Sequence, residues 1–78
     1  MTHLEFHKLS FLMELHISFD TEHFASYRAK TPKGDVVIQT CTRRLKNGEF
    51  RKVKRTYIFR NKEYKTIDEL LKDYNEAE

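Results

Sequence analysis

The side chains best suited to bind a ligand are cations gathered between residues 43 and 55. Guanidinium and ammonium groups at this density can neutralise the phosphates of a nucleic acid. We therefore expect a nucleic-acid-binding site here, although charges at a sheet edge can also serve to prevent aggregation. The predicted site comprises Arg43, Arg44, Lys46, Arg51, Lys52, Lys54 and Arg55.

This cluster lies in a basic middle segment between two acidic ends. Residues 24–62 carry twelve Lys or Arg against Asp35 and Glu49, a net charge of +10. Residues 1–23 carry −3 and residues 63–78 carry −4, so the whole chain is only +3. Charge separated in this way indicates a basic surface for an anionic partner, and ordinary charge scatter on a solvated sheet face is the alternative.

The other reactive side chains predict neither catalysis nor metal binding. His3 and His7 would share a face of a helix, but no third ligand stands at a suitable spacing. Cys41 could act as a thiolate beside Lys54, although a position within a strand favours a structural role. The chain has no glycine-rich phosphate loop, no Ser-His-Asp pattern and no paired carboxylates on a credible cleft. We expect no enzyme, no catalytic residue, no metal and no cofactor.

The length of 78 residues predicts a single domain, 1–78, with a thin core, because so short a chain hides only roughly 60% of its unfolded surface. A hydrophobic content of 38% and an aromatic content of 13% argue against disorder. Cys41 is the only cysteine, and the longest apolar run covers residues 11–13. Together with the absence of a signal-peptide pattern, these features predict a cytoplasmic protein that has no membrane partner.

Patterns of apolar residues predict the elements that position the cations. Every second residue from Leu9 to Phe19 is apolar, which predicts a half-buried strand at 9–19. Thr2 and Glu5 have the spacing of a capping box, so a helix within residues 3–15 is the alternative. Further strands are expected at about 24–30, from residue 36 onward, and at about 50–59.

Turn and capping signals complete the predicted fold. Residues 31–35 contain Pro32 and Gly34 and predict a turn, Asn47-Gly48 predicts a two-residue type I′ hairpin, and residues 61–63 should break the last strand. Thr66 and Glu69 form a second capping box before an apolar stripe that predicts a helix ending near Ala77. The stripe consists of Ile67, Leu70, Leu71 and Tyr74. The predicted fold class is α+β: a small antiparallel β-meander of about four strands with one C-terminal helix packed on one face.

A two-residue loop at Asn47-Gly48 sets a register for the hairpin. It places Val36 opposite Phe59 and Ile38 opposite Tyr57 in the core half, and Cys41 opposite Lys54 above them. In the distal half it places Arg44 opposite Arg51 and Arg43 opposite Lys52, pairs of like charge that are destabilising. Three aromatic residues could stack on bases if exposed, but so small a domain needs them in its core. They are Tyr27, Phe50 and Tyr57.

The basic hairpin favours a small, non-enzymatic nucleic-acid-binding protein, for DNA or RNA. The alternative is an inhibitor or adaptor of the kind made by phages and mobile elements. Such anti-CRISPR-like or anti-restriction-like proteins bind a host protein complex. Here the basic hairpin would bind an acidic surface of that complex. The long alternating strand at 9–19 could also pair with a second copy and form a homodimer. No stretch resembles a known family closely enough for functional residues to be transferred.

Overall fold

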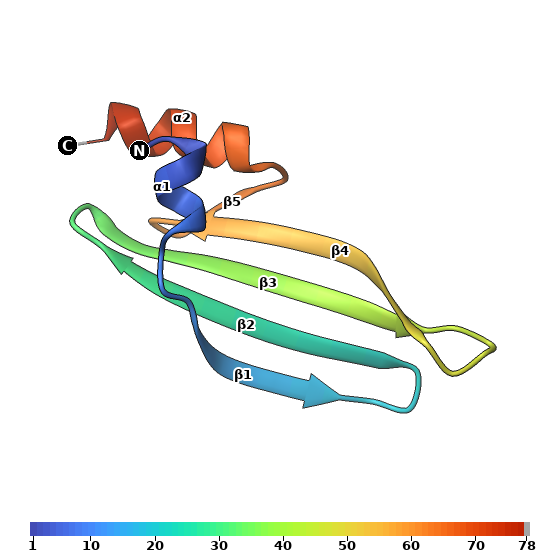
Figure 1. The fold of residues 1–78 in the computed structure, drawn as a ribbon. Helices are drawn as coiled ribbons and strands as arrows, with labels where there is room; N and C mark the ends of the chain where they lie inside the picture. Colours follow the sequence, from blue (N-terminus) through green and yellow to red (C-terminus); the bar gives the residue numbers. More distant parts are fainter. Residues whose placement is uncertain (78) are drawn as a thin grey trace.

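The computed structural model describes residues 1–77, which form two helices and one five-stranded sheet. The strands pair antiparallel with their neighbours in sequence, in the order β1-β2-β3-β4-β5 (Figure 1). The predicted α+β meander with a C-terminal helix is confirmed, with five strands rather than about four. In chain order the elements are α1 (His3–His7), β1 (Leu12–Ser18), β2 (Glu22–Thr31), β3 (Gly34–Arg44), β4 (Phe50–Phe59), β5 (Lys62–Tyr64) and α2 (Ile67–Glu76).

The sheet extends well beyond the helices. Both helices lie over one end of it, whereas the β3–β4 hairpin projects away from them (Figure 1). The described chain measures 46 × 22 × 21 Å. Its radius of gyration of 13.9 Å exceeds the roughly 11.5 Å expected of a compact domain of this length. We call the end under the helices proximal, the other end distal, the face that carries the helices the helix-side face, and the opposite one the open face.

The core lies between α2 and the proximal part of the helix-side face. Leu70 of α2 and Val36 of β3 have no exposed surface. The predicted apolar stripe is confirmed, because Leu70, Leu71 and Tyr74 are buried and Ile67 packs at the edge of the core. The buried cluster consists of Phe6, Val36, Tyr57, Phe59, Tyr64, Leu70, Leu71 and Tyr74.

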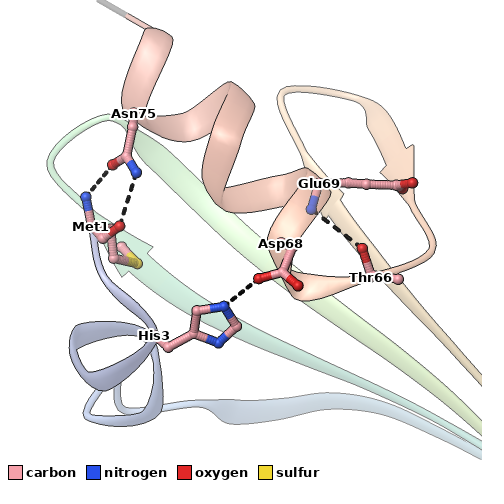
Figure 2. Close-up of polar contacts among 6 residues, drawn as sticks. All are labelled: Met1, His3, Thr66, Asp68, Glu69 and Asn75. Carbon is pink, nitrogen blue, oxygen red and sulfur yellow. Dashed lines mark hydrogen bonds and ion pairs between the residues drawn. The ribbon is translucent and has the colours of Figure 1, made fainter.

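The predicted capping box fixes the start of α2. Thr66 Oγ1 accepts a hydrogen bond from the Glu69 backbone N–H at 3.3 Å (Figure 2). The Glu69 carboxylate in turn accepts one from the Lys65 backbone N–H at 3.3 Å. The first bond is that of the predicted capping box, whereas the second comes from the residue before the N-cap rather than from Thr66 itself. The helix ends at Glu76 with Ala77 as its C-cap, close to the predicted end.

The N-terminal segment contains both of the structures predicted for it. Thr2 caps α1 by accepting from the Glu5 backbone N–H at 3.2 Å, but this helix lasts only five residues. The strand then begins at Leu12, so the predicted strand at 9–19 was too long at its start. The side chain of Asn75 contacts both the amino group and the carbonyl of Met1, and His3 contacts Asp68 (Figure 2). These contacts tie the N-terminus to α2.

The fifth strand exists because the chain turns tightly after Phe59. Arg60 and Asn61 have φ values of 50° and 64°, the left-handed pair that a type I′ turn requires. The predicted break after the fourth strand is confirmed, but it is a tight turn rather than an entry into the helix, because Lys62 and Glu63 pair with β4 as a fifth strand. The Arg60 guanidinium donates to the Lys33 carbonyl at 3.2 and 3.3 Å, which connects this turn to the turn between β2 and β3.

A polar cluster holds β5 against α2. The Tyr64 hydroxyl donates to Asp73 Oδ2 at 2.7 Å, and Lys62 Nζ lies 3.0 Å from the same oxygen. Burial, together with the hydrogen bond to Asp73, raises the pKa of Tyr64 to about 12. The hydrogen bond from Tyr64, followed by that from Lys62, lowers the pKa of Asp73 from its usual 3.8.

This cluster predicts a specific acid sensitivity. Because the pKa of Asp73 is lower in the folded chain, its stabilising effect is complete above pH 3.8 and is lost as the pH falls through the folded-state value. Asp73→Asn should therefore reduce the fall in unfolding free energy between pH 5 and pH 2, measured by urea titration. Asp20→Asn, at an exposed carboxylate outside this cluster, is the control. An equal acid dependence in wild type and Asp73→Asn would contradict the prediction.

Candidate nucleic-acid interface

The loop at the distal tip differs from the predicted two-residue turn. The Gly48 N–H donates to the Leu45 carbonyl at 3.0 Å, and the Leu45 N–H donates to the Glu49 carbonyl at 2.7 Å. Gly48 has a φ of +87°, whereas Asn47 has a negative φ. This is a three-residue loop in which a type I turn precedes a left-handed glycine. Asn47-Gly48 thus marks the hairpin correctly but predicts the wrong turn type.

The longer loop and a β-bulge reset the distal register. The predicted pairs Val36–Phe59, Ile38–Tyr57 and Cys41–Lys54 are confirmed. Beyond them the register shifts between Cys41 and Thr42, so Val53 has no partner on β3. The predicted pairing of Arg44 with Arg51 and of Arg43 with Lys52 is therefore wrong. Arg43 lies opposite Arg51, Arg44 opposite Phe50, and Thr42 opposite Lys52.

All seven predicted site residues are exposed and lie on the distal hairpin. Residues directly opposite on paired strands share a face, so the register assigns each side chain to one side of the sheet. The hairpin is consequently cationic on both faces. Arg44, Lys52 and Arg55 belong to the helix-side face, Arg43, Arg51 and Lys54 to the open face, and Lys46 to the loop.

Only one of these seven cations has an acidic partner among residues 1–77. Arg43 Nη2 lies 3.3 Å from the Glu22 carboxylate of β2. By contrast, Arg28 in the middle of the sheet contacts both Glu14, at 3.1 Å, and Asp35, at 3.3 Å. The distal hairpin therefore carries six cations without an ion-pair partner against the single carboxylate of Glu49, and this concentration of charge produces a positive field at that end of the molecule.

The three aromatic candidates have different environments. Tyr57 is only 6% exposed and belongs to the core, as its role in a small domain predicts. Tyr27 is half-buried, whereas Phe50 at the start of β4 is 46% exposed. Of the three, Phe50 is therefore the one most accessible to a ligand.

The side chains weighed for other chemistry have ordinary structural surroundings. His3 contacts Asp68 of α2, and Cys41 is half-buried on the open face opposite Lys54. Within residues 1–77, no three His, Cys, Asp or Glu side chains are grouped as a metal site would require. Neither helix of the described chain is long and apolar enough to cross a membrane.

The exposure of β1 is a feature that the sequence pattern did not predict. All seven of its residues are exposed, including Leu12 at 74% and Leu15 at 54%. A bulge between Met13 and Leu15 turns these two side chains to opposite faces, so the alternating residues do not form one buried face. The predicted half-buried strand is therefore wrong in burial. Leu15 and Ile17 instead line a groove of about 330 Å³ on the open face.

Comparisons with known proteins identify no relative. No family model matches the chain, and neither a curated protein nor a solved structure matches it. The charges and exposed side chains of the distal sheet are accordingly the basis for a functional proposal.

The pair of like charges formed by Arg43 and Arg51 predicts a stabilising substitution. In Arg51→Glu a carboxylate faces Arg43, which should raise the unfolding free energy by about 0.2–1 kcal/mol. For a domain of this size the melting temperature should rise by roughly 1–8 °C, as measured by thermal denaturation at low salt. Lys46→Glu in the loop makes the same charge change without a cross-strand partner and is the control. An equal rise in both variants would contradict the proposed pairing.

Proposed function

We propose that this protein is a small, non-enzymatic, cytoplasmic nucleic-acid-binding protein that uses the distal half of its sheet. The observation that carries the proposal is that six exposed cations on one projecting hairpin have no acidic partner in the described chain. Phosphate groups supply the charge that these side chains lack. A two-stranded ribbon of this kind fits a major groove or follows a single strand.

Protection of a sheet edge does not account for the whole cluster. Because β5 pairs only with residues 57–59, the distal part of β4 is an edge, and its cations can discourage aggregation. However, Arg43 and Arg44 belong to β3, which is paired on both sides, and Lys46 lies in the loop. The long edge strand β1 contains no Lys or Arg at all. Three of the seven cations therefore lie away from a sheet edge, and one long edge carries no cation.

The proposal predicts salt-sensitive binding of nucleic acid. Fluorescence anisotropy with labelled oligonucleotides should show an affinity that falls linearly on a log–log plot against salt, with a slope of about −5 if six phosphates of a duplex are contacted. Replacing Arg44 and Arg51 together by Glu should lower the affinity at least about tenfold, because it removes two phosphate contacts and introduces repulsion.

The matched control replaces Lys8 and Lys72 by Glu. Both are exposed outside the distal hairpin, so this variant has the same net charge as the test variant. It should retain most of the binding. Absence of binding by the wild-type chain at low salt, or an equal loss in both double variants, would contradict the proposal.

The exposed edge of β1 favours a second candidate, binding to another protein chain. A strand at the edge of a sheet can pair through its free side with a strand from another protein. An inhibitor or adaptor of a host complex could bind in this way. Three of these side chains are Leu12, Met13 and Leu15, each more than half exposed. The segment 9–19 predicted to form a homodimer contact contains β1, and self-association through it stays a prediction.

Light scattering coupled to size exclusion tests this second candidate. The chain has a mass of 9.5 kDa, so a dimer should measure about twice that value. If β1 pairs with its copy, Leu15→Lys should restore the monomer, whereas the exposed Leu4→Lys in α1 should not. A wild-type monomer at all concentrations would exclude the homodimer. In that case, a protein retained from nuclease-treated lysate by wild type but not by Leu15→Lys would indicate a different partner.

A further inference from the structure

The distal parts of the two sheet faces differ in charge. The strands β1 to β4 contain three acidic residues, Glu14, Glu22 and Asp35. Each of them contacts an arginine of the open face, either Arg28 or Arg43. The distal helix-side face, by contrast, has no carboxylate on any of these strands. Its charged side chains are Arg44, Lys52 and Arg55.

A row of rings crosses this same acid-free surface. The ring centroids of His16 and His23 are 5.5 Å apart, and those of His23 and Phe50 are 4.2 Å apart. The three rings come from β1, β2 and β4, so the row runs across the strands. They border a hollow of about 450 Å³ that the helices leave open. Its walls include Met13, His16, His23, Tyr27, Thr42 and Phe50.

Phe50 shows that this row is a surface rather than part of the core. Its side chain is 46% exposed, packs edge-on against His23 and does not belong to the core cluster. Exposure of a phenyl ring to water is unfavourable, and a base stacked on the ring would remove this cost by covering its face. Arg44 lies opposite Phe50 on β3, and Lys52 lies two residues after Phe50 on the same face. The two cations can therefore hold the phosphates on either side of such a base.

We infer that the distal helix-side face binds single-stranded nucleic acid, with bases stacked on the Phe50–His23 rings and phosphates held by Arg44, Lys52 and Arg55. This inference rests on the proposed nucleic-acid function and specifies its substrate class. Rings beside a line of cations are the combination that single-strand-binding surfaces use, because every base presents a flat face regardless of sequence. In a duplex the faces of the bases are covered by their neighbours, so the rings would find no partner.

Base stacking gives a reason for an exposed phenylalanine at position 50, which phosphate binding alone does not. Contacts to phosphate require cations and hydrogen-bond donors, and they would be as strong with a polar residue in place of Phe50. Replacing one aromatic residue on which a base stacks by alanine lowers the affinity for the nucleic acid roughly 5- to 150-fold. A duplex bound only through its phosphates should be insensitive to Phe50.

The test uses Phe50→Trp, because the chain contains no tryptophan and the introduced indole is a single reporter. Titration with an unlabelled single-stranded oligonucleotide of about ten nucleotides should quench its fluorescence, since a stacked base quenches indole emission. A blunt duplex of the same sequence should leave the emission unchanged. Phe50→Ala should lower the single-strand affinity at least about fivefold and leave duplex affinity unaltered.

The control is Phe19→Trp, which places the reporter at another exposed phenylalanine that packs against Phe24 of the open face. Its emission should not respond to the single strand. If nucleic acid binds by anisotropy but the reporter at position 50 is not quenched, the stacking surface is wrong and the proposed function stands. Equal quenching by the duplex also overturns the inference. If no nucleic acid binds at low salt, both proposals fail together.

Discussion

The limited covering of the sheet by the helices is the constraint on which the rest of this structure depends. The described chain reaches 46 Å in its longest dimension, and its two short helices cover only one end of the sheet, where the core around Leu70 and Val36 lies. Nine large apolar side chains of the described chain stay exposed, and a domain of this size hides only roughly 60% of its unfolded surface. The long strands are therefore held distally by backbone pairing and small cross-strand contacts alone. Distal to Tyr57 no residue of the sheet is fully buried on either face, although some, such as Cys41, are half-buried.

Two bulges decide what that surface looks like. A bulge adds one residue to one strand and thereby reverses the side on which the following residues lie. The shift at Glu14 puts Met13 on the helix-side face and Leu15 on the open face. The shift at Val53 moves Lys52 to the helix-side face, beside Arg55, and leaves Arg51 with Arg43 on the other. The distribution of charge between the two faces is thus set by irregularities rather than by the alternation of the sequence.

This explains how far the sequence could predict the structure. Helix α2 was predictable because its cap at Thr66 and its stripe at Leu70 and Tyr74 are local patterns that one helix face satisfies. The core half of the β3–β4 hairpin was predictable from β-branched and aromatic residues in register. The distal register was not, because it depends on whether Asn47 adopts a positive φ and on a bulge that no local pattern marks. The alternation in β1 predicts a strand correctly, but whether a face is covered depends on residues elsewhere in the chain.

The candidate site was likewise only partly predictable from the sequence. That seven cations are exposed could be inferred from composition, since such side chains are rarely buried without a partner. The ring row of His16, His23 and Phe50 could not, because Phe50 is far from both histidines in sequence and reaches their face only through the shifted register of β3 and β4. The crowding of charge also gives this end of the molecule a physical reason to bind an anion. On the distal helix-side face the positive charges of Arg44, Lys52 and Arg55 repel one another with no strand carboxylate between them, and a bound phosphate would reduce that repulsion. Because a ligand that binds only the folded chain stabilises it by mass action, the hairpin would be least stable when empty and most ordered when occupied.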